Sequence, residues 1–227
     1  MPARRHSAEK GSHAGSMGTA RAERASPRLY LVTPPISEPD AVADDLATAL
    51  NAADIAAVLL RLAEGTEREL IARVEALRIL IQSNGAALLL DGHPALVART
   101  QVDGAHLRGI AAFNAAAPTL KPSYIAGCGG LGTRHEAMLA GEAGADYAMF
   151  GEPDADEHRP RLEAVLERVA WWAEVMTIPC VGYAARVDEI ALLAQAGAEF
   201  VAIGENIWRN DMRRAIDALT RAPEPVR

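Results

Sequence analysis

The stretches EAMLAGEAGADYAMFGE at residues 136–152 and EIALLAQAGAEFVAIGE at residues 189–205 decide the fold. Without a gap, they match at both terminal Glu residues and through the Ala-Gly-Ala turn. In each stretch, an alanine and leucine run at helical spacing ends at a glycine suited to a left-handed C-cap, and a short apolar run then stops at Gly151 or Gly204. The unit is a helix, a turn and a buried strand, and its recurrence predicts a repeated α/β architecture.

The same alternation continues on both sides of the repeat. Strands are predicted over residues 29–33, 56–60, 86–90, 103–106, 124–126, 147–150, 180–182 and 200–203. Helices are predicted in the first repeat and over residues 40–52, 66–82, 94–100, 161–175, 187–196 and 211–220, whereas the alanine-rich segment through Ala117 has no clear assignment. Eight strands with intervening helices predict a single-domain (β/α)8 TIM barrel. The competing open doubly wound sheet would more often carry a Gly-rich fingerprint after the first strand, where this chain has Thr33-Pro34-Pro35.

Composition and charge narrow the class of protein. Half of the 227 residues are hydrophobic, which is enough for one large core. No apolar run reaches about 18 residues, so no membrane span is predicted. The two cysteines, Cys128 and Cys180, make no disulfide framework, which favours a reducing cytoplasm. The net charge of −7, despite a basic N-terminal tail, argues against a nucleic-acid groove.

The expected barrel domain spans residues 28–221, between a basic N-terminal tail at 1–27 and a short C-terminal tail at 222–227. The N-terminal tail lacks apolar periodicity and is expected to be disordered. A targeting signal is the alternative because the tail is rich in Arg and Ser, and Met17 is an alternative start. The sequence leaves monomer and homo-oligomer open.

Candidate functional residues follow the strands, because the loops at the carboxyl ends of barrel strands converge on one mouth. These residues are Thr33, Arg61, Asp91, His106, Arg108, Cys128, Glu152, Tyr183, Glu205 and Asn206. The carboxylates Asp91, Glu152 and Glu205 would bind a hard divalent ion or perform acid–base work if they converge. The alternative for each residue is a solvated loop position, and for His106 a hydrogen-bonded packing role.

Seven motifs in chain order carry a family resemblance across residues 28–221. They are RLYLVTP, LLRL, LLLDGHPALV, QVDGAHLRG, HEAMLAGEAGADYAMFGE, IPCVGYA and AGAEFVAIGENI. In combination they resemble the thiamine phosphate synthase family, which also includes thiazole tautomerases. The resemblance implies a (β/α)8 barrel and a transferase of thiamin biosynthesis that joins hydroxymethylpyrimidine diphosphate to thiazole phosphate with Mg²⁺. That chemistry needs cations and backbone N–H groups to hold the leaving pyrophosphate.

The resemblance also assigns roles to positions in this chain. It implies catalytic roles for Arg61, Arg159 and His106 and a metal-binding role for Asp91. It places substrate-binding positions at Thr33, Cys128, Gly130, Gly182, Ala184 and Glu205. The implied partners are therefore small phosphorylated pyrimidine and thiazole substrates, with no nucleic acid and no membrane.

The chain departs from the family pattern at the metal site and at the phosphate site, among other places. The second metal-binding Asp falls on Ala111, and the glycines that bind phosphate after the seventh strand fall on Ala184-Ala185. The phosphate-binding Ser after the eighth strand is replaced by Glu205. A carboxylate 4 Å from a negative charge costs about 4 kcal/mol at an effective dielectric near 20, so this change would weaken phosphate binding.

Three functional hypotheses follow. The first is a thiamine phosphate synthase. The second is a thiazole tautomerase, whose expected histidine falls at Gly132, with His135 on the following helix instead. The third is a non-catalytic barrel of the same family that binds a related ligand or a partner protein. The departures at Ala111, Ala184-Ala185 and Glu205 favour this hypothesis.

Overall fold

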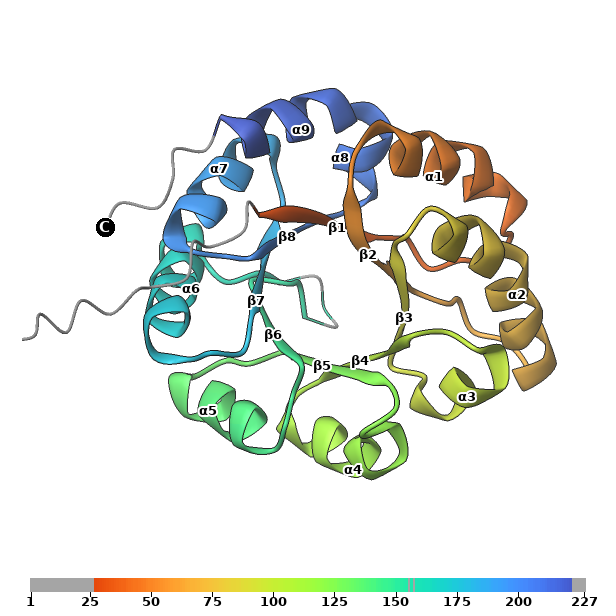
Figure 1. The fold of residues 1–227 in the computed structure, drawn as a ribbon, viewed down its shortest axis with the longest axis horizontal. Coiled ribbons are helices and arrows are strands. Elements are labelled where there is room, and N and C mark those ends of the chain that lie inside the picture. The colour runs from red at the N-terminus through yellow and green to blue at the C-terminus, as the bar shows by residue number, and fades with distance from the viewer. Residues whose placement is uncertain (1–26, 155, 157, 222–227) are drawn as a thin grey trace, which may run out of the picture.

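Eight parallel strands close into one barrel in the computed structural model, which describes residues 27–154, 156 and 158–221 (Figure 1). The strands are β1 Arg28–Val32, β2 Ile55–Leu60, β3 Ala87–Asp91, β4 Gly104–Arg108, β5 Ile125–Gly129, β6 Tyr147–Phe150, β7 Cys180–Ala184 and β8 Phe200–Ile203. Their order around the barrel is the order in the chain, and β1 pairs with β8 to complete the ring. The predicted (β/α)8 TIM barrel is confirmed. The expected tails at 1–27 and 222–227 lie outside the described residues, apart from Pro27.

Helices surround the strands on the outside (Figure 1). They are α1 Asp40–Ala52, α2 Glu67–Ser83, the 3₁₀ turn η1 Pro94–Leu96, α3 Val97–Thr100, α4 Ile110–Leu120, α5 Arg134–Glu142, α6 Leu162–Val175, α7 Val187–Ala196, α8 Glu205–Asn210 and α9 Met212–Thr220. Among the described residues, no helix combines the length and the apolar character needed to cross a membrane.

Local signals place the helix ends. Thr66 caps α2, its side chain and that of Glu69 forming the capping box that this spacing predicts. In the internal repeat, Gly197 ends α7 with φ 104°, a left-handed conformation that glycine adopts without steric cost. The repeated unit therefore builds the two modules α5–β6 and α7–β8 of the barrel.

Two elements differ from the sequence-based expectation. The unassigned segment around Ala117 is the helix α4, which contains Pro118 and is composed almost wholly of small or apolar residues, so it has no polar face to mark its period. Residues after Gly204 form the short helix α8, which begins where β8 ends. Its Trp208 donates the indole N–H to the carbonyl of Val32 at 2.9 Å and fastens α8 to β1.

The barrel has an inner and an outer apolar core. The inner core fills the barrel and consists of Tyr30, Val32, Ala57, Leu59, Leu89, Tyr147, Met149, Val181 and Ala202. The outer core lies between the strands and the helices, where Trp172 and Phe150 pack edge to face with ring centroids 5.6 Å apart. Alternate strand residues point to the two cores, as the period of two requires.

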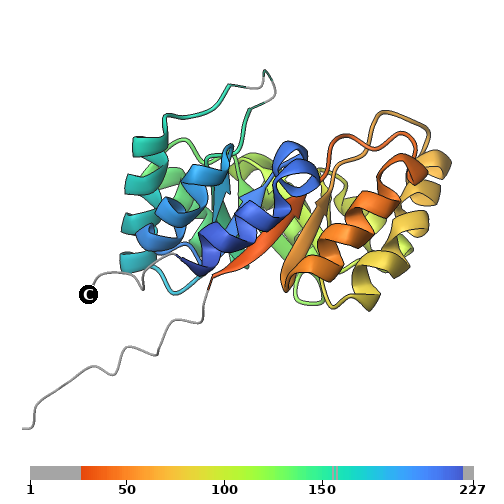
Figure 2. The same ribbon diagram turned by 90° about the horizontal axis from the view of Figure 1, so that it is seen from above.

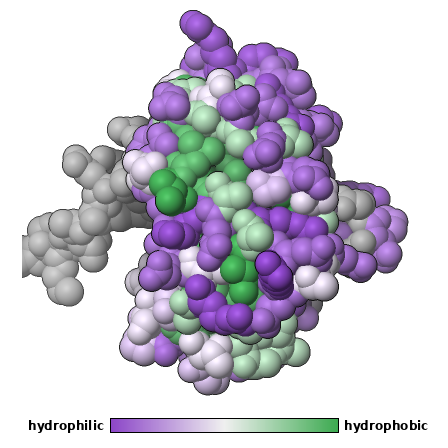
Figure 3. Space-filling model, turned by 90° about the vertical axis from the view of Figure 1, so that its right-hand side faces the viewer, coloured by the Kyte–Doolittle hydropathy of each residue, from purple (hydrophilic) through white to green (hydrophobic). Residues whose placement is uncertain are grey.

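The connection between β6 and α6 stands above the ring on the side where β1 ends (Figure 2). In Figure 1 the same connection reaches toward the barrel centre. The carboxyl ends of the strands and this connection therefore share one side of the molecule. The face on the right of Figure 1 is mostly hydrophilic, with separate hydrophobic patches (Figure 3).

Candidate active site

A small cavity of about 20 Å³ lies at the carboxyl-terminal mouth of the barrel. It is lined by Val32, Leu59, Arg61, Arg108, Met149, Glu152, Pro153, Asp154 and Tyr183. A second hollow adjoins it beside the ends of β4, β5 and β6 and shares Arg108, Met149, Glu152, Pro153 and Asp154. Apolar side chains of the inner core thus form the floor of the mouth, and charged side chains surround it.

Asp91, at the end of β3, lies between two arginines. Arg108 donates from Nε to Asp91 Oδ1 at 3.3 Å and from Nη2 to Oδ2 at 3.1 Å. Arg61 approaches Oδ2 at 3.6 Å. The side chain of Asp91 is 13% exposed, whereas those of Arg61 and Arg108 are about one-third exposed. The mouth therefore presents two guanidinium groups around one carboxylate.

Glu152 follows β6 and is buried at the mouth. Its Oε2 lies 3.1 Å from His106 Nε2 and 3.9 Å from Arg108 Nη2, and its Oε1 accepts the backbone N–H of Gly130. Burial acts to raise the pKa of Glu152, but attraction to His106, the hydrogen bond from His106, the charge of Arg108 and the Gly130 N–H together hold it below its usual value. Glu152 is thus an ionised carboxylate inside the mouth.

A chain of hydrogen bonds extends from Glu152 into the barrel. Because an ionised carboxylate only accepts, His106 donates from Nε2 to Glu152, and its Nδ1 lies 2.9 Å from the Tyr147 hydroxyl. Tyr147 in turn lies 2.9 Å from the hydroxyl of Tyr30. Burial raises the pKa of both tyrosines, so both hydroxyls keep their protons. The chain holds the imidazole of His106 in one orientation.

Glycines on β5 make room for this chain. The strand register places His106 beside Gly127 and Gly127 beside Tyr147. A Cβ on Gly127 would lie 2.0 Å from the Tyr147 ring, and one on Gly129 would lie 1.9 Å from Glu152 Oε1. Tyr147 on β6 and Glu152 after it therefore reach His106 across a strand that has no side chains at these positions.

Arg159 is held in an ion pair away from the mouth cavity. Its guanidinium donates to the carbonyls of Gly151 at 2.8 Å and Tyr183 at 2.6 Å and forms a two-point contact with Glu189 at 2.8 and 3.1 Å. The same carboxylate accepts the backbone N–H of Ala185 at 2.9 Å. Glu189 thus occupies one of the N–H groups that the family resemblance assigns to phosphate.

The remaining predicted residues do not line the mouth cavity. Thr33 is buried, and its hydroxyl accepts the backbone N–H of Arg61 at 3.0 Å. Cys128 and Ala184 are wholly buried in the outer core, and burial, followed by the nearby charge of Glu152, raises the pKa of Cys128 to about 12. Gly182 lies against Leu193 of α7.

Glu205 and the residues expected of a tautomerase also lie apart from the cavity. Glu205 forms an ion pair with Arg209 one helical turn along α8. This ion pair draws the side chain of Glu205 along the helix. Gly132 borders the second hollow, and His135 is exposed on α5. Gly130 borders the second hollow as well, and its backbone has φ 64°.

The Mg²⁺ implied at Asp91 does not fit the residues there. Mg²⁺ requires oxygen ligands at about 2.0–2.1 Å in octahedral geometry. Both carboxylate oxygens of Asp91 accept from Arg108. Among the described residues, Asp91 belongs to no group of three His, Cys, Asp or Glu ligand atoms within 4.8 Å of one another.

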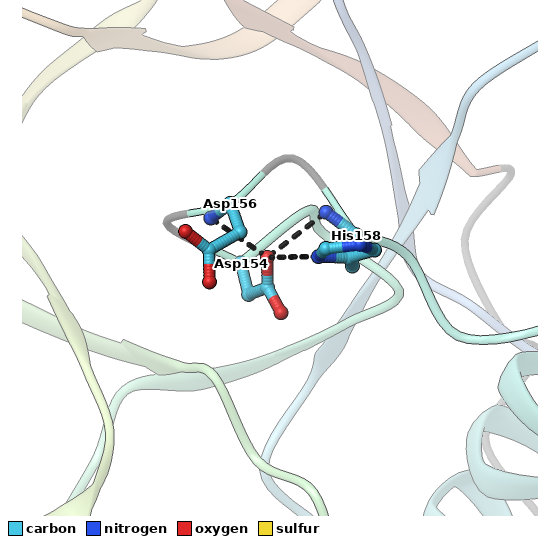
Figure 4. A group of neighbouring side chains, drawn as sticks. All are labelled: Asp154, Asp156 and His158. Atoms are coloured by element: carbon cyan, nitrogen blue, oxygen red, sulfur yellow. Dashed lines mark hydrogen bonds and ion pairs between the residues drawn. The ribbon is translucent and has the colours of Figure 1, made fainter.

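One such group lies in the connection between β6 and α6 and consists of Asp154, Asp156 and His158, all exposed (Figure 4). Asp154 Oδ1 accepts the backbone N–H groups of both Asp156 and His158 at 2.9 Å. These hydrogen bonds close a turn, which accounts for the proximity of the three side chains without an ion.

The closed barrel, with arginines and carboxylates at its carboxyl-terminal mouth, belongs to the class of (β/α)8 proteins with a small-molecule site at that mouth. The family model described as thiamine monophosphate synthase matches residues 29–207. A thiamine-phosphate synthase of Rhodospirillum centenum is 40% identical over 187 residues, covering 81% of this chain and 90% of that protein. A thiamine-phosphate synthase of Hyphomonas neptunium is 34% identical over 197 residues, covering 81% of this chain and 87% of that protein. The chain belongs to the thiamine monophosphate synthase family.

A solved structure agrees with the fold. A thiamine phosphate pyrophosphorylase from Pyrococcus furiosus superposes with a TM-score of 0.72 at 20% identity, covering 88% of this chain and 98% of that one. At this identity the likeness supports the barrel alone.

Sequence reasoning did not identify three residues of the polar networks, Tyr30, Tyr147 and Glu189, and it did not pair Glu152 with His106. The glycines at alternate positions of β5 were the available signal, because they leave space between His106 and β6. The partner that fills such a space lies on another strand and has no fixed spacing in the sequence.

Proposed function

We propose that this protein is a thiamine phosphate synthase, which joins hydroxymethylpyrimidine diphosphate to thiazole phosphate and releases pyrophosphate. The observation that carries the proposal is the convergence of Arg61 and Arg108 on the mouth cavity of a barrel of this family. Guanidinium groups bind phosphate oxygens through two parallel hydrogen bonds and stabilise the charge that develops on a leaving pyrophosphate.

The other side chains of the mouth suit the organic part of such a substrate. Val32, Leu59, Met149 and Tyr183 line the cavity and would contact a heterocyclic ring bound at the mouth. Ionisation of the pyrimidine from its pyrophosphate creates a cation, and the charge of Glu152 would stabilise it at close range in the buried site. No step is assigned to Mg²⁺, because the groups around Asp91 do not fit it.

The proposal is tested by incubating purified protein with both phosphorylated substrates and measuring thiamin phosphate by chromatography. We expect product with the wild type and at least about a hundredfold less with Arg61→Ala. Loss of a charge-assisted contact to the leaving group raises the activation free energy of the reaction by about 3 kcal/mol or more. Absence of product at high protein concentration, in buffers with and without Mg²⁺, would reject synthase activity.

A binding barrel without synthase activity is the second candidate. Glu189 favours it, because its carboxylate engages both Arg159, to which the family resemblance assigns a catalytic role, and the Ala185 N–H, which it assigns to phosphate. A thermal shift with each precursor separates the two candidates, since a ligand that binds only the folded state raises the melting temperature. A shift without turnover supports the binding role.

Domain extent, location and assembly complete the proposal. We propose one barrel domain over residues 28–221, a cytoplasmic location, small phosphorylated substrates as partners, and no binding of nucleic acid or membranes. Homo-oligomer formation is tested by size-exclusion chromatography with light scattering. Exposed apolar side chains on different helices, Ile79 on α2 and Leu192 on α7 among them, are available for subunit contacts.

A further inference from the structure

We infer that the mouth binds the diphosphate of its substrate without a divalent metal ion, the guanidinium of Arg108 taking the position of the cation on Asp91. This inference rests on the proposed function and deepens it by naming the groups that hold the anion. They are Arg61 and Arg108, which both line the mouth cavity.

The contacts of Asp91 carry the first step. Each carboxylate oxygen accepts one N–H from Arg108, at 3.3 and 3.1 Å. This is the side-by-side geometry in which a guanidinium binds a carboxylate most strongly. A divalent ion on the same oxygens would have to break both hydrogen bonds and would lie beside a positive charge.

The contacts of Arg108 carry the second step. Beyond Asp91, Arg108 donates from Nη1 to the carbonyl of Pro153 at 2.8 Å and lies 3.9 Å from Glu152. These groups come from β3 and from the segment after β6, so the guanidinium is fixed from two sides of the mouth. A cation fixed in this way needs little reorganisation when an anion binds, and in this respect it resembles a bound metal ion.

Arg61 supplies the charge that remains for the anion. Asp91 and Arg108 compensate each other, whereas Arg61 contacts Asp91 only at 3.6 Å, and its side chain is 32% exposed. Within the described part of the chain, its guanidinium makes no hydrogen bond. Glu152 does not compensate it, because that carboxylate is bound by His106 and the Gly130 N–H. The guanidinium N–H donors of Arg61 are therefore available to an anion that enters the cavity.

The test titrates inorganic pyrophosphate into the full chain by isothermal titration calorimetry, in EDTA and in Mg²⁺. We expect binding in EDTA that is no tighter in Mg²⁺, because Mg²⁺ competes with the protein for pyrophosphate. Binding that appears only with Mg²⁺, or no binding in either buffer, would overturn the inference.

Variants locate the site. Arg61→Gln and Arg108→Gln are each expected to weaken pyrophosphate binding in EDTA by about tenfold or more, the loss of one charge-assisted hydrogen bond. Arg99→Gln is the matched control, because Arg99 pairs with Glu67 on the helical surface. Circular dichroism of each variant checks the fold. Unchanged affinity in folded Arg61→Gln would also overturn the inference.

A metal readout independent of activity completes the test. Mn²⁺ binding is followed by electron paramagnetic resonance in the wild type, Asp91→Asn and Asp154→Asn. We expect Asp91→Asn to bind as much Mn²⁺ as the wild type. If Asp91→Asn alone loses bound Mn²⁺, a metal occupies Asp91 and the inference fails, whereas a loss in Asp154→Asn alone assigns the ion to the exposed turn.

Failure of the inference and failure of the proposed function give different results. Thiamin phosphate formation that EDTA abolishes keeps the function and rejects the metal-free site. Pyrophosphate binding in EDTA without thiamin phosphate formation keeps the metal-free site and rejects the synthase.

Discussion

At the residue scale, Glu152 shows how a buried carboxylate stays ionised. Burial alone would favour its protonated form, yet His106, Arg108 and the Gly130 N–H all favour the charged form. The outcome matters for chemistry, because a carboxylate with a lowered pKa is a weak base and a permanent negative charge. Glu152 is therefore suited to stabilising a cation and to holding His106.

The stability of the protein should depend on Glu152 at acidic pH. Its pKa in the folded state lies below the unfolded value of 4.5, so its stabilising contribution is fully present above about pH 4.5 and is lost as the pH falls through the folded pKa. Urea unfolding of the wild type and Glu152→Gln from pH 7 down to acid measures this. We expect the stability advantage of the wild type to shrink below about pH 4.5, and an advantage that stays constant would contradict it.

Cys128 should be unreactive in the native protein. Its thiol is wholly buried, and its pKa is raised to about 12, so almost no thiolate exists at neutral pH. Iodoacetamide labelling followed by mass spectrometry is expected to leave Cys128 unmodified at pH 8 in the native state and to modify it in urea. Rapid native labelling would show that the thiol reaches solvent.

At the element scale, Glu189 connects three parts of the barrel. It lies in the first turn of α7, accepts the Ala185 N–H that follows β7, and pairs with Arg159 in the connection to α6. Its side chain is 4% exposed and that of Arg159 17%. The pair therefore holds the connection after β6 against the end of β7.

Replacing Glu189 should destabilise the protein strongly. Glu189→Ala leaves Arg159 partly buried without its carboxylate partner, and breaking such a pair costs about 3–5 kcal/mol. Asp188→Ala is the matched control, because Asp188 forms an exposed pair with Arg186 that water screens, so its loss should change stability little. Urea denaturation measures both. Equal effects of the two substitutions would show that burial of the Glu189 pair does not matter.

At the scale of the whole molecule, the closed ring joins distant segments into one structure. β1 pairs with both β2 and β8, so the first and last strands of the chain are neighbours. Trp208 reports on the β1 side through its bond to Val32, and Trp172 reports on the α6 side through Phe150. The two indoles provide local probes on different parts of the ring.

Unfolding should be one transition at both places. Leu31→Ala and Phe150→Ala remove buried side chains from β1 and β6 and should each cost about 2–5 kcal/mol. Tryptophan fluorescence and circular dichroism should report the same shifted midpoint for each variant, whereas Ile79→Ala, whose side chain is 67% exposed, should shift it little. Different midpoints by tryptophan fluorescence and by circular dichroism would show that the barrel unfolds in parts.

Local sequence patterns suffice to predict the barrel. Helical spacing, capping boxes and strand periodicity are properties of neighbouring residues, so β6, α7 and β8 have the bounds that their residues predict. The departures were α4 and α8, where a helix without a polar face and a helix starting at a strand end give no local contrast. The candidate residues at strand ends followed from the same local pattern, because every parallel strand ends at the same mouth.

The tertiary structure alone decided which of these residues meet. Glu152 and Glu205 end equivalent units of the repeat, yet one binds His106 inside the mouth and the other pairs with Arg209 on α8. His106 and Glu152 are 46 positions apart and meet because β5 has no side chain between them. A local pattern sets where a strand ends, whereas ring closure, strand register and neighbouring space set the partner of each charge.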